Sequence, residues 1–112
     1  MVNRSAVLLT CKQPFVDWIN GVESVDEVHD VTLDDVNRER TVYLIDEESA
    51  ENLESMLKEH FKLFFELECY NWYTDESLWP SKFTLKLFHK WFDIECNSVV
   101  EDLVGTKIID ED

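Results

Sequence analysis

The sequence predicts an α+β fold: a two-layer domain in which about three helices pack on a small mixed β-sheet of three to four strands. Short apolar runs alternate with longer segments whose apolar residues recur at i, i+3 and i+4. Of the 112 residues, 45% are hydrophobic and 31% are charged, which is typical of a globular chain. We therefore expect a single domain over residues 1–112, with an acidic, frayed C-terminal end from about residue 110.

Four segments have the composition of β-strands. Residues 6–9 form a continuous apolar run, and residues 41–45 (TVYLI) are rich in β-branched and aromatic side chains, so both are predicted to be buried strands. Residues 92–96 alternate between apolar and acidic side chains, as in a half-buried strand, and residues 99–104 are expected to continue it past a bend. Residues 108–109 can add a short edge strand. If the first two strands are parallel neighbours, their crossover should be right-handed.

The first predicted helix has Pro14 in its first turn, where a proline is tolerated because no backbone donor is needed there, and Gly21 near its end as a stop signal. Its apolar residues at helical spacing are Phe15, Trp18, Ile19 and Val22. A second, shorter helical turn is predicted over residues 33–37. Thr32 and Asp35 stand three residues apart before and inside this turn, which is the spacing of a reciprocal cap.

The longest helix is predicted to be capped by Ser49 and carries an apolar stripe over residues 53–65, opposite a charged face. A further helix is expected over about residues 81–91, with Pro80 in its first turn. Helices of this kind bury their apolar stripe against a sheet, which completes the two predicted layers.

The chain is strongly acidic, with 25 acidic and 10 basic residues, a formal net charge of -15 and a sequence pI near 4.4. Thirteen of the acids fall within residues 17–54, where Arg38 and Arg40 are the bases. Such a surface repels phosphate backbones and anionic lipid, so we expect no direct binding to nucleic acid or membranes. It favours basic partners, although a solvated acidic surface without a specific partner is an open alternative.

The cysteines and the hydropathy pattern bear on the compartment. Cys11, Cys69 and Cys96 are far apart and include no CxxC pair, so we expect free thiols rather than a disulfide framework. No apolar run approaches the roughly 20 residues needed to cross a bilayer. Residues 1–10 hold too short an apolar run for a signal peptide. The expected compartment is the cytoplasm.

Aromatic side chains concentrate in one segment, since residues 61–92 hold eleven of the fourteen. Most of them have helical spacing and can fill a core. The others lie in a predicted connector loop, and loops run over protein surfaces. Exposed tryptophan and tyrosine are frequent anchors of protein interfaces, so we predict a binding role for this aromatic connector, which comprises Tyr70, Trp72, Tyr73 and Trp79.

Lys82, Lys86 and Lys90 recur every four residues along one edge of the predicted helix at 81–91. Lysine side chains often lie along an apolar helix face while they keep their charge in water, which is one interpretation of this lysine stripe. The other is a basic docking strip that orients an acidic partner or a second copy of the chain.

Cys11 is the candidate catalytic residue of the sequence. It lies where a predicted strand passes to a helix N-terminus, and exposed backbone N–H groups there can lower the pKa of a thiol. Lys12 can assist. No second cysteine or glycine-rich anion loop accompanies them, so a packed, inert thiol is the alternative.

No metal or cofactor site is predicted. His29, His60 and His89 belong to no HExxH or ExxH motif, and His60 is expected to be a satisfied core histidine. The acidic stretch at residues 26–35 lacks the central glycine of an EF-hand loop. The sequence also has no GxSxG, P-loop or GxGxxG motif.

Several segments resemble a family of short, acidic, uncharacterised bacterial proteins. They are residues 3–7 (NRSAV), 12–15 (KQPF), 72–80 (WYTDESLWP) and 91–95 (WFDIE), and together they span most of the chain. The WYTDESLWP segment is the most distinctive of them. The family has no known activity, so the resemblance implies a bacterial cytoplasmic origin and carries over no ligand or catalytic residue.

The sequence favours a non-enzymatic, cytoplasmic protein-interaction module that uses the aromatic connector and the lysine stripe to bind a protein partner or a second copy of itself. Two alternatives stay open. One is a small thiol-dependent enzyme that uses Cys11. The other is an acidic nucleic-acid mimic that binds a basic protein, which predicts carboxylates in a regular elongated array.

Overall fold

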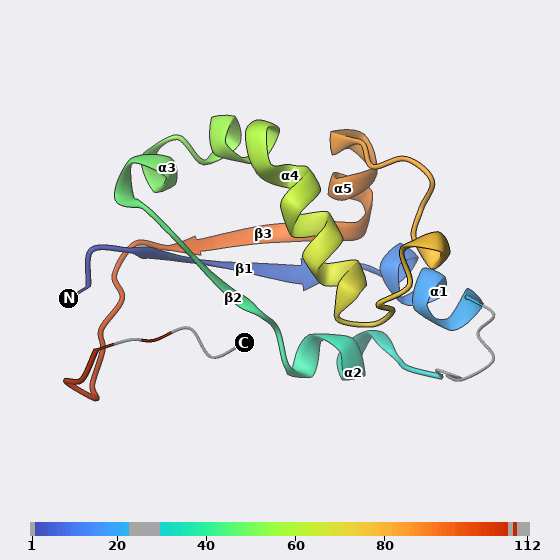
Figure 1. The fold of residues 1–112 in the computed structure, drawn as a ribbon, viewed down its shortest axis with the longest axis horizontal. Helices are drawn as coiled ribbons and strands as arrows, with labels where there is room; N and C mark the ends of the chain where they lie inside the picture. Colours follow the sequence, from blue (N-terminus) through green and yellow to red (C-terminus); the bar gives the residue numbers. More distant parts are fainter. Residues whose placement is uncertain (1, 23–29, 108, 110–112) are drawn as a thin grey trace.

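The computed structural model describes residues 2–22, 30–107 and 109 and has an α+β fold, as predicted (Figure 1). Among these residues, one hydrophobic cluster takes buried side chains from both the strands and the helices. The elements are β1 (Ser5–Cys11), α1 (Gln13–Gly21), α2 (Leu33–Arg38), β2 (Val42–Ile45), α3 (Glu47–Glu51), α4 (Leu53–Tyr70), the 3₁₀ turn η1 (Glu76–Leu78), α5 (Leu85–Trp91) and β3 (Phe92–Asn97).

The three described strands form a sheet in the order β2-β1-β3, and both pairs are antiparallel, so the prediction of a mixed sheet is wrong. Val7 of the central strand pairs with Tyr43 on one side and with Cys96 on the other. The side chain of Asn37 shows why β2 runs backward. Its Oδ1 accepts a hydrogen bond from the Cys11 N–H at 2.8 Å, and its Nδ2 donates to the Cys11 carbonyl at 3.0 Å. Helix α2 therefore brings the chain back to the C-terminal end of β1, at Cys11. Strand β2 starts close to this end and runs antiparallel to β1.

The helix starts differ from the predictions in two places. Asp46, not Ser49, is the cap after β2, because its carboxylate accepts a hydrogen bond from the Ser49 N–H at 2.6 Å and starts the short helix α3. Helix α4 then begins separately at Leu53. The last helix begins at Leu85 rather than near Pro80, because the Thr84 hydroxyl accepts from the Leu87 N–H at 3.1 Å and caps it there. The Thr32–Asp35 capping box and the proline in the first turn of α1 are confirmed.

The segment after β3 is irregular, so the predicted strand over residues 99–104 is wrong. One backbone hydrogen bond, from the Val2 N–H to the Val100 carbonyl at 2.9 Å, ties it to the start of the chain. Because β1 begins only at Ser5, its ladder with β3 does not extend into residues 99–104. In the predicted edge strand at 108–109, Ile109 is not in a strand and Ile108 lies outside the described residues, as do residues 110–112.

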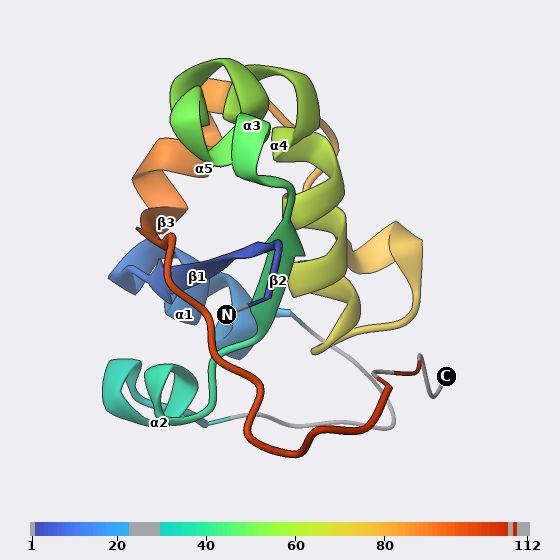
Figure 2. The same cartoon turned by 90° about the vertical axis from the view of Figure 1, so that its left-hand side faces the viewer.

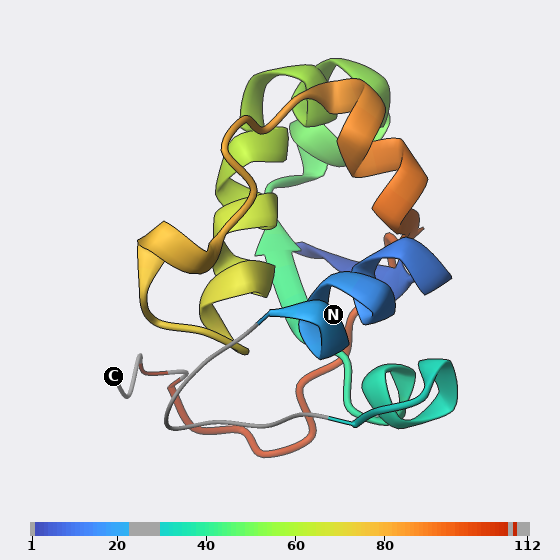
Figure 3. The ribbon, with the colours of Figure 1, turned by 90° about the vertical axis from the view of Figure 1, so that its right-hand side faces the viewer.

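The core lies between the sheet and the helices above it. Figures 2 and 3 show α3, α4 and α5 on one side of the strands, while α1 and α2 lie toward the end where β1 finishes. Phe65 of α4 is fully buried, and its ring contacts those of Phe88, Trp91 and Phe92 at centroid distances of 5.2–5.9 Å. The predicted aromatic stripes of the helices therefore fill the core and hold α4 and α5 on the sheet.

Candidate functional site

The aromatic connector is folded onto the body of the protein. Tyr73 is only 3% exposed, and its hydroxyl donates a hydrogen bond to the Ile19 carbonyl at 2.5 Å. The Trp79 indole donates to the Tyr73 carbonyl at 2.7 Å, and both Trp79 and Trp72 are partly buried against the core. Tyr70 is 55% exposed, but it is the last residue of α4 rather than part of a loop. The four side chains therefore do not form one exposed cluster, since Tyr73 is buried, Trp72 and Trp79 are partly buried and Tyr70 is exposed.

Helix α1 explains this burial. The ring of Trp18 meets that of Tyr73 edge-on, with centroids 5.4 Å apart, and its indole N–H donates to the Leu78 carbonyl at 3.2 Å. Asp75 caps η1 by accepting a hydrogen bond from the Ser77 N–H at 3.0 Å. Tyr73 and the 3₁₀ turn thus join the end of α4 to α1.

The lysine stripe does not exist as one helical edge. Lys82, Lys86 and Lys90 are all exposed, but α5 begins at Leu85, so Lys82 lies in the segment that precedes the helix. Lys86 and Lys90 keep the four-residue spacing. Two exposed lysines on a short helix are a solvent face and do not by themselves form a docking strip.

Cys11 is buried, which agrees with the packed, inert thiol rather than with the weaker candidate of a reactive one. Burial, with a smaller contribution from the negative charge of Glu68, raises the pKa of the Cys11 thiol to about 12. The group is therefore a neutral thiol near pH 7, whereas nucleophilic chemistry needs the thiolate. Lys12 does not assist it, because the Lys12 ammonium bonds to the His89 carbonyl at 2.8 Å and lies 3.2 Å from the Asp93 carboxylate.

The histidines are not brought together. His60 is more than half exposed and lies 3.8 Å from the Glu59 carboxylate, so its prediction as a core histidine is wrong. His89 is exposed on α5, and His29 lies outside the described residues, as do residues 26–29 of the acidic stretch. In the part of the chain that the structure describes, no group of three or more His, Cys, Asp or Glu side chains is placed to hold a metal ion.

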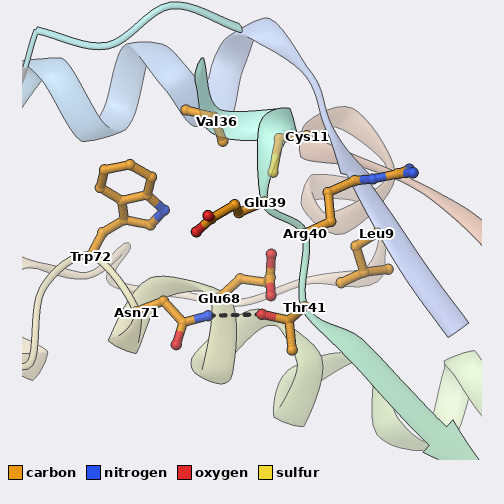
Figure 4. A pocket seen from close by; sticks show the side chains of 9 residues that line it. All are labelled: Leu9, Cys11, Val36, Glu39, Arg40, Thr41, Glu68, Asn71 and Trp72. Atoms are coloured by element: carbon orange, nitrogen blue, oxygen red, sulfur yellow. Dashed lines mark hydrogen bonds between the residues drawn. The ribbon is translucent and has the colours of Figure 1, made fainter. Parts of the chain in front are cut away.

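A pocket of about 270 Å³ lies where the end of β1, the start of β2 and the end of α4 meet (Figure 4). The most buried charged residue among those that line it is Glu68, which is only 8% exposed. The Tyr43 hydroxyl donates a hydrogen bond to Glu68 Oε2. Burial raises the pKa of Glu68, and the Tyr43 hydrogen bond opposes part of that effect. The lining residues are Leu9, Cys11, Val36, Glu39, Arg40, Thr41, Glu68, Asn71 and Trp72.

The charged groups of this pocket, which we call the Glu68 pocket, point in different directions. Figure 4 shows the Glu39 and Glu68 carboxylates directed into the hollow and the Arg40 guanidinium directed away from it. Arg40 Nη1 donates to the Thr10 hydroxyl at 2.9 Å and lies 3.6 Å from the Glu95 carboxylate. The inside of the pocket is therefore acidic although an arginine contributes to its wall.

Strand β2 has a second notable surface, which we call the apolar edge. In the described part of the chain β2 pairs only with β1, so its other edge has no ladder partner. Val42 and Leu44 are about half exposed on one side of this strand. On the other side, the exposed α4 residues Leu63, Leu67 and Tyr70 recur at i, i+4 and i+7. A groove of about 340 Å³ between β2 and α4 includes Leu44, Leu63 and Leu67 in its walls.

Acidic groups stand at both ends of the apolar edge. The Glu68 pocket, which includes Thr41, adjoins the start of β2. Just beyond the end of β2, a polar hollow of about 280 Å³ is lined by Asp46, Glu48 and Glu59 together with neighbouring serine and asparagine side chains. The apolar edge therefore lies between two clusters of carboxylates.

The sequence contains signals for these residues. Glu68 stands four residues after Phe64 and three after Phe65, so it is in phase with the buried stripe of α4, where a carboxylate is unusual. Leu63 and Leu67 are out of phase with that stripe, which indicates a second apolar face on the same helix. Nothing in the sequence pairs Glu39 with Glu68, because sheet topology brings them together.

Comparison with protein-family models, curated proteins and solved structures finds no match for this chain. The resemblance built on the WYTDESLWP segment therefore stays a prediction, and function is argued from geometry. Within residues 2–22, 30–107 and 109, no helix is both long and apolar enough to cross a membrane.

Proposed function

We propose that the protein is a non-catalytic interaction module that binds an extended segment of a basic partner protein along the apolar edge. The observation that carries this proposal is that β2 has one unpaired edge with apolar side chains on both of its sides. Such an edge is a template for an added strand, in which backbone hydrogen bonds supply affinity and alternate side chains supply specificity.

Charge selects the partner. The chain carries a formal net charge of -15, and carboxylates stand at both ends of the apolar edge. Glu39 and Asp46 are seven residues apart, and an extended chain rises about 3.3 Å per residue, so a partner with basic residues about seven positions apart would reach both clusters. We therefore expect a strand with an apolar centre and basic ends.

The same charges argue against a second copy of the chain as the occupant. An antiparallel pair of β2 strands would bring the Asp46 end of each copy against the Glu39 end of the other. Like charges placed across an interface cost affinity and suppress that pairing. We therefore expect no self-association through the apolar edge, and its observation would make a second copy the occupant of the edge.

The other sequence-based hypotheses have less structural support. The raised pKa of Cys11 argues against a thiol-dependent enzyme. A nucleic-acid mimic needs its acids in a regular array, but Asp35, Asp46 and Asp75 stand at the starts of three different helical segments and Glu68 is buried. Two of the three free cysteines are buried and none is in a disulfide, in line with a protein of the reducing cytoplasm.

The test is the binding of a short acetylated peptide with arginine at both ends and alternating threonine and valine between them. Its control is the same peptide N-methylated at alternate residues on its bonding edge, which removes the backbone donors. We expect binding of the first peptide and at least tenfold weaker binding of the second by isothermal titration calorimetry.

Matched protein variants locate the surface. Leu63→Ser and Leu67→Ser should weaken peptide binding, whereas Leu103→Ser should not, because Leu103 is exposed elsewhere in the segment after β3. Equal affinity for both peptides would contradict strand addition. A dimer in sedimentation velocity that the Leu67→Ser variant dissolves would assign the edge to a second copy instead.

A further inference from the structure

We infer that the Glu68 pocket is a binding site for a guanidinium group, held by the carboxylates of Glu68 and Glu39 beside the indole of Trp72. Glu68 supplies the strongest reason. It is more than nine-tenths buried, yet the hydrogen bond that reaches it among the described residues ends on Oε2, while the carboxyl group faces the pocket. A carboxylate held in so largely desolvated a place is costly, and a cationic ligand in the pocket would offset part of that cost.

The other walls favour a planar cation. Glu39 places a second carboxylate toward the same hollow, so the two can share the five N–H donors of one guanidinium group. Trp72 contributes an aromatic wall. A guanidinium group stacks on aromatic faces and is more weakly hydrated than an ammonium group, so it loses less on entering a half-enclosed site.

The size of the pocket limits the ligand. Its volume of about 270 Å³ lies below the roughly 300–1,000 Å³ of pockets that enclose drug-sized molecules. It therefore suits one side chain or a small cation rather than a nucleotide or a large metabolite.

The protein's own arginine does not fill the site. Arg40 is the nearest cation, but its guanidinium is committed to Thr10 and Glu95 on the other side of β1. In another part of the pocket wall, the Asn71 amide donates a hydrogen bond to the Thr41 hydroxyl at 3.3 Å. This bond holds the end of α4 against the start of β2. The acidic inside is thus open between two fixed walls.

The position of the pocket connects it to the apolar edge. Thr41 lies immediately before β2, so a basic side chain at one end of a strand added to β2 would reach the pocket. This step, that the guanidinium group belongs to an arginine of the partner strand, rests on the proposed function. The affinity of the pocket for a guanidinium group does not.

The experiment therefore has two arms. In the first, N-acetyl-arginine amide is titrated into the protein and followed by NMR of the Trp72 indole N–H, with N-acetyl-citrulline amide as its uncharged counterpart. We expect a saturable shift with the arginine compound and at least tenfold weaker binding of the citrulline compound. Glu68→Gln and Glu39→Gln should each weaken arginine binding about tenfold or more, whereas the control Glu66→Gln, on the same helix but outside the pocket, should not.

In the second arm, the arginine-ended peptide is compared with one that carries citrulline at both ends. If the arginine compound and the citrulline compound bind equally, or if Glu68→Gln leaves arginine binding unchanged while its thermal unfolding matches wild type, the pocket assignment is overturned. If the pocket binds the arginine compound but the backbone-methylated and unmodified peptides bind alike, the proposed function fails and the guanidinium site stands.

Discussion

The two edge strands of the sheet present opposite surfaces. On β3 the exposed side chains include Asp93 and Glu95, which lie 3.2 Å from the Lys12 ammonium and 3.6 Å from the Arg40 guanidinium respectively. On β2 the exposed side chains are Val42 and Leu44. Charged side chains are a common means of preventing an edge strand from pairing with another chain. One edge is therefore protected, and the other is left open to a partner.

The acidic residues near each edge differ in the same way. Those of β3 are exposed and partnered by bases, so their negative charge is balanced locally. Beside β2, Glu68 is buried with a tyrosine hydroxyl as its donor, and Glu39 faces the same hollow. The acidic groups without a neighbouring base in this comparison therefore lie beside β2, the strand whose edge carries no charged side chain.

The largest effect should come from giving β2 the surface of β3. The double substitution Val42→Lys and Leu44→Glu places charges on the open edge and should weaken peptide binding at least about 30-fold, the equivalent of one hot-spot contact of about 2 kcal/mol. Stability should fall by only about 1 kcal/mol per site or less, because both side chains are half exposed.

Calorimetric titration with the arginine-ended peptide and chemical denaturation measure these two quantities. The matched control is Val99→Lys, an exposed valine outside the sheet, which should leave affinity unchanged. Full-strength binding by the double variant would mean that the two edges do not differ in function.

The fold class was predictable because the periodicities are strong. The strands at β1 and β2, the helix over residues 53–65 and the Thr32–Asp35 cap all appear where local pattern places them. The antiparallel direction of β2 was not predictable, since it depends on the Asn37 contacts with Cys11, which join residues 26 positions apart. Helix starts were missed where a competing cap, Asp46 or Thr84, stands a few residues away.

The candidate site was harder to predict than the fold. Its loop position favours a surface location for the connector, but Trp18 supplies a partner for Tyr73 that sequence spacing cannot show. The exposed leucines of α4 were detectable as residues out of phase with its core stripe. The Glu68 pocket needs three segments to meet and has no sequence signature beyond one carboxylate on an apolar helix face.

The second prediction uses pH to separate the buried acid from the exposed ones. The folded-state pKa of Glu68 is raised above its usual value by burial, so the folded state binds more protons than the unfolded state in the interval between the two values. Glu68 should therefore reduce stability as pH rises from about 4.5 through its folded pKa.

Urea denaturation of wild type and of Glu68→Gln at a series of pH values measures this contribution. The stability of the variant should improve relative to wild type across that interval, and the control Glu66→Gln should show no such trend. The groups that face Glu68 are Tyr43 of β2, Cys11 of β1, Glu39 and Arg40 of the segment before β2, and Cys69 of its own helix. A constant difference between Glu68→Gln and wild type would show that Glu68 keeps an ordinary pKa.

The smallest effect should come from removing a charge on the protected edge. Glu95→Gln breaks the ion pair with Arg40, and because Glu95 is half exposed, stability should fall by about 0.5 kcal/mol or less and the difference should shrink in high salt. Thermal denaturation at low and high ionic strength measures it, with Glu51→Gln of α3 as an exposed acid outside the sheet for comparison. Arginine-ended peptide affinity should stay within twofold of wild type, because β3 lies across the sheet from the apolar edge. A loss of peptide binding as large as that of the β2 double variant would place the partner on the β3 edge. If Glu95 only protects β3 from pairing, the bound peptide makes no contact with its carboxylate, and removing the charge cannot weaken binding.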